Sequence, residues 1–271
     1  MISENSNKHF TKKNKIHYGN YKKKPSLNGF LTLVKKGIIP RPHYALGLLL
    51  AAKQAFDLGY KKIKVFELGC HNLEGLVDLE NYVSDIKKFL KIDFEIFGFD
   101  LKEGLPKYTP NNFDRLSRWS PGDYSLDIKK NLKYLNNSKI FYGDVKKTIP
   151  NFIKKYKKTF LTSPIAFVIY DLDYYTSTKN GLNLLKLKSN NYIPKTYVYF
   201  GDYLMSSFDE GERKAVFEFN KISKYKISNI GELAEQLSIF FKKWIFLGKR
   251  LNVINYFNHK KHKKKVDQIL F

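Results

Sequence analysis

The segment at residues 64–75, Lys-Val-Phe-Glu-Leu-Gly-Cys-His-Asn-Leu-Glu-Gly, constrains the fold more than any other part of this chain. Residues 64–68 predict a short buried strand, and Gly69 ends it in a polar turn. Apolar residues then recur at helical spacing: Leu73, Leu76, Val77, Leu79 and Val83. A strand, a tight glycine turn and a helix form the unit that binds a nucleotide-like cofactor at the carboxyl edge of a parallel sheet.

Strands and helices alternate along the rest of the chain. Strands are expected at residues 94–100, 139–142, 165–170 and 197–200, and strand-like runs follow at 224–230 and 251–257. Helices are expected at residues 26–34, 42–58, 74–90, 127–135, 146–157, 210–222 and 232–241. This alternation predicts an α/β fold: a Rossmann-like, doubly wound, mostly parallel sheet with helices on both faces and a C-terminal antiparallel hairpin.

The length of 271 residues favours one large α/β domain. We expect a flexible basic arm at residues 1–25, the domain at 26–258 and a solvated basic tail at 259–271. The apolar run at residues 45–52 is too short to span a bilayer, and no signal peptide frames it. A single cysteine, Cys70, excludes an intrachain disulfide and a thiolate metal cluster, which favours a reduced, cytoplasmic setting.

The chain is strongly basic. It carries 49 Lys and Arg against 25 Asp and Glu, a formal net charge of +24. Two interpretations stay open: a lysine-rich composition without a specific role, or attraction to an anion such as a nucleotide sugar, an anionic glycan, lipid headgroups or RNA. The tyrosine-rich segment 193–200 and the segment 244–247 are candidates for a homo-oligomer interface.

Acidic residues follow the expected parallel strands. Asp100, Asp144, Asp171 and Asp202 each stand at or just after a strand end, and Glu67 lies inside the first strand. A single such acid is ordinarily a helix cap. Because ligands bind at the carboxyl edge of an open α/β sheet, the recurrence of acids at successive strand ends indicates a binding site there.

These residues carry a family resemblance. Glu67-Leu-Gly69, Gly98-Phe-Asp100, Gly143-Asp144 and Asp171-Leu-Asp173 resemble the successive motifs of class I S-adenosylmethionine-dependent methyltransferases. Residues 171–178, Asp-Leu-Asp-Tyr-Tyr-Thr-Ser-Thr, are similar to a segment of macrocin-type sugar O-methyltransferases. The resemblance extends over about residues 39–259.

The resemblance implies a binding role for each residue of the cofactor set. Gly69 would let the backbone approach the methionine part of S-adenosylmethionine, with Glu67 holding its amino group through the turn. Asp100 would accept both ribose hydroxyls, since a carboxylate suits a diol. Asp144 would lie at the adenine amino group. Asp171 would border both the cofactor and the acceptor.

The sequence departs from the family pattern in two places. His71 and Leu73 occupy positions that are glycine in the usual turn, so His71 either contacts the cofactor or has no special task. Related enzymes hold Mg²⁺ with acids after the fourth and fifth strands. Here Asp171 and Asp202 match, whereas Gly201 replaces one ligand. Metal dependence therefore stays open.

Methyl transfer to a hydroxyl needs one proton removed. The resemblance makes Asp171 or Asp173 the expected base, with His43 and His259 as outside candidates. The long segment at residues 102–127 is expected to close over the acceptor. Four aromatic residues are candidates for the acceptor wall, although two of them, Tyr174 and Tyr175, equally suit a packing role; the four are Trp119, Tyr124, Tyr174 and Tyr175.

The sequence thus predicts an S-adenosylmethionine-dependent O-methyltransferase acting on a saccharide or nucleotide-sugar hydroxyl, with an anionic acceptor favoured by the basic charge. The alternative is an RNA methyltransferase or a non-catalytic nucleic-acid-binding protein with the same fold; no RNA-binding module supports it. A nicotinamide-dependent oxidoreductase is disfavoured because the turn contains no Gly-x-Gly-x-x-Gly.

Overall fold

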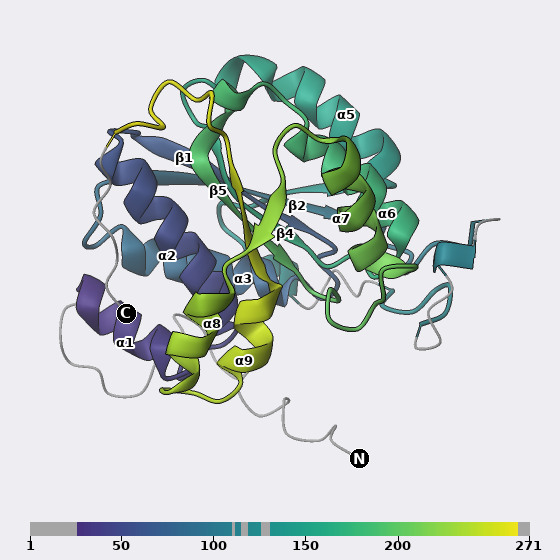
Figure 1. The fold of residues 1–271 in the computed structure, drawn as a ribbon, viewed down its shortest axis with the longest axis horizontal. Coiled ribbons are helices and arrows are strands. Elements are labelled where there is room, and N and C mark those ends of the chain that lie inside the picture. Colours follow the sequence, from purple (N-terminus) through teal and green to yellow (C-terminus); the bar gives the residue numbers. More distant parts are fainter. Residues whose placement is uncertain (1–25, 110–111, 115–118, 126–130, 265–271) are drawn as a thin grey trace.

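A single mixed sheet of seven strands lies at the centre of the computed structural model, which describes residues 26–109, 112–114, 119–125 and 131–264 (Figure 1). The strand order is β3-β2-β1-β4-β5-β7-β6. The strands are β1 (Lys62–Leu68), β2 (Asp93–Asp100), β3 (Lys139–Tyr142), β4 (Ile165–Tyr170), β5 (Tyr192–Phe200), β6 (Ile227–Asn229) and β7 (Leu251–Asn255). β1 to β5 pair in parallel, and β7 is antiparallel to both of its neighbours. This is the Rossmann-like arrangement of class I methyltransferases, so the predicted fold is confirmed.

Helices cover both faces of the sheet and bury a core on each (Figure 1). One face carries α1 (Leu27–Lys35), α2 (Pro42–Asp57) and α3 (Glu74–Ile86), together with α8 (Gly231–Ser238) and α9 (Trp244–Leu247). The other face carries α5 (Val145–Tyr156), α6 (Tyr175–Gly181) and α7 (Gly211–Ile222). Because both faces are covered, a central strand such as β4 is apolar throughout and fully buried.

The site is positioned by the way the chain leaves β1 and β4. These strands are neighbours in the sheet, yet α3 follows β1 onto one face and α6 follows β4 onto the other. The connections therefore diverge at the carboxyl ends of the two strands and leave a crevice between them.

Several element boundaries differ from the sequence predictions. β5 begins at Tyr192 rather than at residue 197, since a register shift in β4 lets the earlier residues pair. α3 ends at Ile86, short of residue 90. Of the helix expected at residues 127–135, residues 126–130 lie outside the described part, and a single 3₁₀ turn stands at Leu132–Tyr134.

The proposed interface at residues 193–200 is wrong. These residues form most of β5, which lies between β4 and β7, and their side chains are buried except for that of Lys195. Their apolar character serves the core of the sheet. In the second candidate segment, α9, the indole of Trp244 is buried but the side chains of Ile245 and Phe246 are exposed.

The beginning of the basic tail is packed rather than solvated. The side chain of His259 is 6 % exposed, and its Nε2 lies 3.2 Å from the Tyr60 hydroxyl. The Lys261 ammonium donates to the Leu58 carbonyl oxygen at 2.7 Å and lies over the Tyr60 ring. The expected arm at residues 1–25 and the end of the tail lie outside the described residues. Of the described helices, none has the length and apolar character needed to cross a membrane.

Candidate active site

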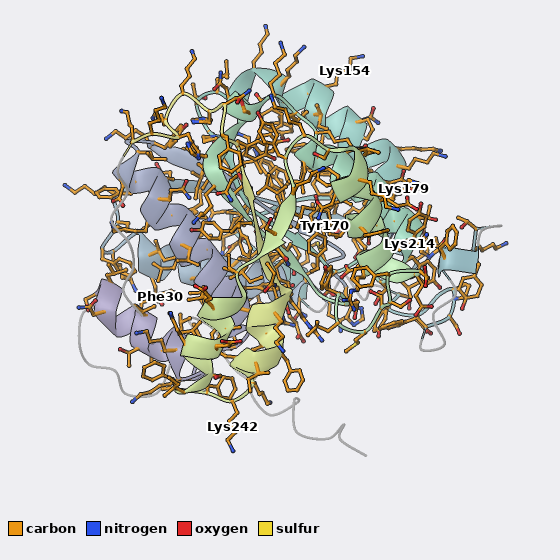
Figure 2. The ribbon with its side chains drawn as sticks, viewed as in Figure 1. Phe30, Lys154, Tyr170, Lys179, Lys214 and Lys242 are labelled. Carbon is orange, nitrogen blue, oxygen red and sulfur yellow. The ribbon has the colours of Figure 1, made fainter. Side chains whose placement is uncertain are left out.

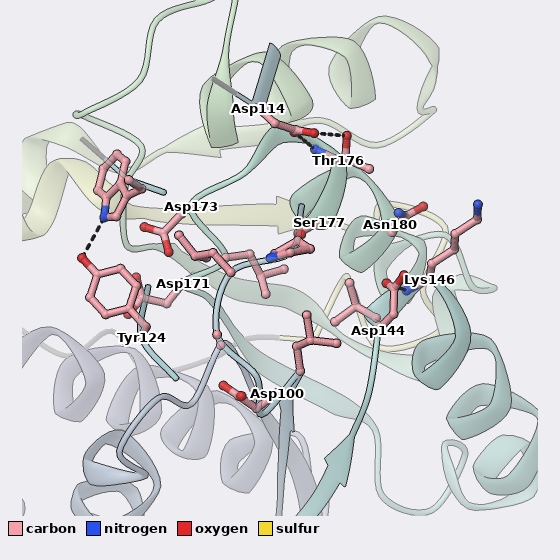
Figure 3. A pocket seen from close by; sticks show the side chains of 18 of the residues that line it. Asp100, Asp114, Tyr124, Asp144, Lys146, Asp171, Asp173, Thr176, Ser177 and Asn180 are labelled. Carbon is pink, nitrogen blue, oxygen red and sulfur yellow. Dashed lines mark hydrogen bonds between the residues drawn. The ribbon is translucent and has the colours of Figure 1, made fainter. Parts of the chain in front are cut away.

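A cavity of about 630 Å³ opens at the carboxyl edge of the sheet, between the ends of β1 and β4 (Figure 3). This volume is typical of small-molecule sites. Residues that follow each of the five parallel strands line it: Gly69, Asp100, Asp144, Asp171 and Asp202. The acids predicted from successive strand ends therefore meet in one place.

The turn after β1 holds Asp100 in position. The amide nitrogens of Cys70 and His71 donate to Asp100 Oδ2 at 2.8 and 3.0 Å, and the amide of Lys102 donates to Oδ1 at 2.7 Å. Gly69 has φ +85°, and a Cβ there would lie 1.8 Å from the backbone carbonyl oxygen of Asp171. Only glycine permits this approach of the two chain segments. A fixed carboxylate thus faces the cavity at the end of β2.

Glu67 lies behind this turn, between β1 and α3. Its side chain is 3 % exposed, and its Oε2 has no hydrogen-bond partner. Gly75 provides the room, since a Cβ there would stand 1.9 Å from Glu67 Oε1. Burial raises the pKa of Glu67 to about 8, although Arg41 and a hydrogen bond from Tyr44 act in the opposite direction. Glu67 is not among the described residues that line the cavity.

Asp144 stands at the opposite side of the cavity from Asp171 in the view of Figure 3. It caps α5, because its Oδ1 accepts from the Lys146 amide at 2.8 Å. Capping uses one carboxylate oxygen, so the other remains a possible acceptor for a ligand. The side chain of Lys146 also lines the cavity.

Three carboxyl groups cluster at the ends of β4 and β5. Burial raises the pKa of Asp171 and of Asp173, and the nearby carboxylate of Asp202 raises both further. Like charges held close together ionise less readily, so Asp171 and Asp173 keep their protons to a higher pH than an isolated carboxyl group does. Asp173 has φ +56°, a left-handed conformation. Figure 3 shows Asp171 and Asp173 on the side of the cavity where Tyr124 lies.

Glu212 supports this cluster from α7 and was missed by the sequence analysis. Its fully buried side chain accepts from the Asp202 amide at 2.7 Å and from the Leu172 amide at 3.3 Å. Burial raises the pKa of Glu212 well above its ordinary value. The available signal was an acid on the apolar stripe that continues through Ala215, Val216 and Phe219.

The residues present do not fit a resident Mg²⁺. A Cβ at Gly201 would lie 1.8 Å from Asp171 Oδ1, so the Asp171 carboxylate occupies the space that another ligand would need. In the described part of the chain, no group of three or more His, Cys, Asp or Glu side chains is placed to hold a metal ion.

Residues 102–109 and 119–125, which we call the cover segment, fold over the cavity through aromatic contacts. Trp119 Nε1 donates to the Tyr124 hydroxyl at 2.7 Å, and the Tyr108 hydroxyl donates to the Trp119 carbonyl at 2.6 Å. Trp119 and Tyr124 line the cavity, as expected for an acceptor wall. Tyr174 instead stacks on Tyr108, and Tyr175 donates to Glu218, so both have the packing role.

Asp114 joins the stretch before Trp119 to the start of α6. Its carboxylate, fully buried, accepts from the Thr176 amide at 2.7 Å, from the Thr176 hydroxyl at 2.8 Å and from the Thr109 hydroxyl. Thr176 and Ser177, whose hydroxyls are of a type that often caps helices, lie inside α6 instead. The N-cap residue is Tyr174, and Asp114 satisfies the free amide from outside the helix (Figure 3).

The three candidate histidines differ in position. His71 lines the cavity, and its Nδ1 lies 3.2 Å from the Tyr124 carbonyl oxygen. Burial lowers the pKa of His43 to about 3, and its ring stacks on Tyr199 with centroids 4.5 Å apart. Neither His43 nor His259 is among the described cavity residues. Cys70 is buried, and burial raises the pKa of its thiol.

No protein-family model matches the chain, and no curated protein matches it in sequence. Among solved structures, the calicheamicin methyltransferase CalS11 aligns at 16 % identity over 78 % of each chain, with a TM-score of 0.49. Cofactor-bound Rv0187 from MTB aligns at 12 % identity over 78 % of this chain and 86 % of its own, with a TM-score of 0.37. The plantazolicin methyltransferase BamL aligns at 9 % identity over 84 % of this chain and 90 % of its own, with a TM-score of 0.37. At these values the likeness concerns the fold.

Proposed function

We propose that this chain is an S-adenosylmethionine-dependent methyltransferase that methylates a hydroxyl of a saccharide or nucleotide sugar. The observation that carries the proposal is one cavity with two differently built ends. Asp100 and Asp144 stand at one end, and the carboxyl groups of Asp171 and Asp173, with their raised pKa values, stand at the other.

The first end suits a nucleoside. Asp100 is fixed by three amides, and its carboxylate would accept the two ribose hydroxyls. Asp144 would accept from the adenine amino group. Gly69 and His71 border the path of the methionine part, whereas Glu67 lies behind the turn and outside the described cavity lining, so a direct contact with the cofactor ammonium is not part of the proposal.

The second end suits a hydroxyl acceptor. A carboxylate whose pKa lies near the working pH is an effective general base, and the pKa of Asp171, raised to about 7, meets that condition more closely than the pKa of Asp173, raised to about 9. Trp119 and Tyr124 would pack on the acceptor from the cover segment. Lys107 lines the same cavity and would contact a phosphate of a nucleotide sugar.

The bound cofactor supplies an electrophilic methyl group on a sulfonium. The chain contributes alignment and one proton acceptor. Trp119 and Tyr124 would orient the acceptor, and Asp171 or Asp173 would take the hydroxyl proton. The buried carboxyl of Glu212 accepts hydrogen bonds from the amides of Leu172 and Asp202. It would in this way fix the backbone that carries these acids.

Calorimetric titration with S-adenosylhomocysteine tests the cofactor. We expect micromolar binding that is indifferent to Mg²⁺, with NAD giving no heat. Asp100→Asn should weaken binding at least about tenfold, because the ribose hydroxyls lose a charged acceptor. Asp123→Asn, at an exposed carboxylate of the cover segment, is the matched control and should bind normally. Equal affinity of Asp100→Asn and the control would refute the assignment of the ribose site.

Turnover with a panel of nucleotide sugars and free saccharides tests the acceptor end. Asp171→Asn and Asp173→Asn should keep S-adenosylhomocysteine binding, and at least one should lose about a hundredfold or more in kcat. Methylation of RNA with no activity on any sugar would overturn the acceptor class while leaving the cofactor assignment in place.

A further inference from the structure

The connection between β6 and β7 is a helical hairpin whose tip is apolar and exposed. α8 and α9 form its two arms. The side chains of Ile239 and Phe240, between the two helices, are 83 and 48 % exposed, and those of Ile245 and Phe246, within α9, are 42 and 62 % exposed. We call residues 239–246 the hairpin tip. Large apolar side chains gathered at the surface mark an interaction site.

The base of the hairpin is packed firmly against the rest of the molecule. Trp244 is fully buried, and its Nε1 donates to the Lys35 carbonyl oxygen at 2.9 Å. Leu237 is also fully buried, and Gly248 packs so closely on Ala234 that a Cβ there would lie 2.4 Å from the alanine Cβ. The base of the hairpin is thus fixed, and the apolar side chains of the tip are directed outward by that packing.

The charges around the tip are positive. Lys242 and Lys243 are exposed within it, Lys249 is exposed just beyond it, and Figure 2 shows Lys242 directed away from the molecule. The Lys35 ammonium lies 5.1 Å from the centroid of the Phe240 ring. The nearest acids of the hairpin, Glu232 and Glu235, lie earlier on α8, and residues 239–249 contain none.

The hairpin leaves the sheet at the edge that carries the cavity. β6 and β5 are both antiparallel to β7, so β6 ends at the same edge as β5. A surface bound by the hairpin tip would therefore lie on the carboxyl side of the sheet, where an acceptor enters.

We propose that the hairpin tip docks this protein on an anionic lipid surface. Ile239, Phe240, Ile245 and Phe246 would enter the boundary between headgroups and acyl chains, and Lys242 and Lys243 would contact the anionic headgroups. A second copy of the chain fits less well, since a two-fold interface centred on the tip would bring these lysines against one another. The proposal does not depend on the proposed methyl transfer.

Vesicle co-sedimentation of the full chain tests the docking. Wild type should bind vesicles of phosphatidylcholine with phosphatidylglycerol and should not bind phosphatidylcholine alone. Ile239→Ser with Phe246→Ser should weaken binding at least about tenfold, because two inserting side chains are lost. The matched control is Phe217→Ser with Ile222→Ser, which removes exposed apolar side chains from α7 on the opposite face and should bind as wild type does.

A second pair of variants separates local from general charge. Lys242→Gln with Lys243→Gln should weaken binding about fivefold per lysine, whereas Lys154→Gln with Lys155→Gln on α5 should leave it unchanged. If both double variants lost the same amount of vesicle affinity, the proposal would be overturned, because binding would then depend on the net charge of the protein and not on the hairpin tip.

Two further outcomes would also overturn it. One is undiminished binding of the Ile239→Ser, Phe246→Ser variant. The other is light scattering that shows a wild-type dimer converted to monomer by the same change, because the tip would then contact a second copy. The circular dichroism spectrum and the thermal unfolding of every variant report whether the fold is intact.

Discussion

Gly69 and Gly59 allow the effect of backbone conformation to be separated from the effect of crowding. Both have a left-handed φ, +85° and +75°, but a Cβ at Gly59 meets nothing within 4 Å, whereas a Cβ at Gly69 would lie 1.8 Å from the Asp171 carbonyl oxygen. Gly59→Ala should lower the free energy of unfolding by about 1–2 kcal/mol. Gly69→Ala should cost at least about 3 kcal/mol, since a clash is added to the same strain.

Urea unfolding monitored by circular dichroism measures both glycine variants. If both variants lose a similar free energy of unfolding, the segments that follow β1 and β4 can move apart without an energetic cost, and the expected clash at Gly69 would be wrong.

Glu67 should make the stability of the protein depend on pH. Its pKa of about 8 lies above its ordinary value, so the folded state binds a proton that the unfolded state has released between those two values. Its stabilising contribution is therefore complete at about pH 4 and is lost as the pH rises through about 8. Glu67→Gln, which stays neutral, should be more stable than wild type by about 2–4 kcal/mol at about pH 9 and nearly equal to it at about pH 4.

Thermal unfolding of wild type and Glu67→Gln across this pH range gives the comparison. A constant difference between the two proteins would show that folding does not change the pKa of the Glu67 carboxyl.

Some residues of the site could be predicted from the sequence and others could not, and the difference has a physical reason. Asp100, Asp144, Asp171 and Asp202 were found because each follows a strand, and strand ends meet at one edge of a parallel sheet. Glu212 and Asp114 were missed because they act across the fold. Glu212 reaches the site from α7, and Asp114 reaches Thr176 from a segment without periodicity. The apolar stripe of α7 indicates that Glu212 is buried, but no local pattern identifies the groups that Glu212 or Asp114 contacts.

At the scale of elements, Asp114 links the chain beside the cover segment to α6. Asp114→Ala removes a buried acceptor of three hydrogen-bond donors from Thr109 and Thr176. We expect faster hydrogen exchange at the Thr176 amide, earlier proteolysis of the cover segment and a loss of about 1–3 kcal/mol in unfolding free energy.

Asp123→Ala serves as the control for this prediction. Asp123 lies in the cover segment, and its exposed carboxylate accepts a hydrogen bond from the Ser120 amide. Hydrogen exchange followed by mass spectrometry measures the protection of the Thr176 amide in both variants. Unchanged protection at Thr176 in Asp114→Ala would contradict the role of this contact.

A helix or strand could be predicted where the sequence pattern that indicates it lies within the element itself. Buried strands such as β4 have continuous apolar runs, and α2, predicted at residues 42–58, spans Pro42–Asp57. The start of β5 was not predictable, since residues 192–196 join the strand only through pairing with β4 and β7. The N-terminus of α6 was also missed, because Asp114 provides its cap from another part of the chain.

At the scale of the whole molecule, charge is distributed unevenly. The chain has a formal net charge of +24, yet more acidic than basic residues line the cavity. The acids include Asp100, Asp144, Asp171, Asp173 and Asp202, and the basic residues are Lys107 and Lys146. Excess positive charge on the rest of the molecule opposes compaction by self-repulsion. Added salt screens this repulsion, so Tm should rise from low ionic strength to about 0.5 M NaCl.

Calorimetric scans at constant pH measure the salt effect, and an equal concentration of uncharged sucrose controls for preferential exclusion. A Tm that falls with salt would show that attractive ion pairs outweigh the repulsion.

The acid-rich lining has a consequence for turnover. A methyl donor of the sulfonium type carries one more positive charge than the thioether that remains after transfer. A cavity bordered by Asp100, Asp144 and Asp202, besides Asp171 and Asp173, favours the more positive of the two. Under the proposed function, the spent cofactor should therefore leave more readily than the fresh one, and product inhibition should be weak without movement of any part of the fold.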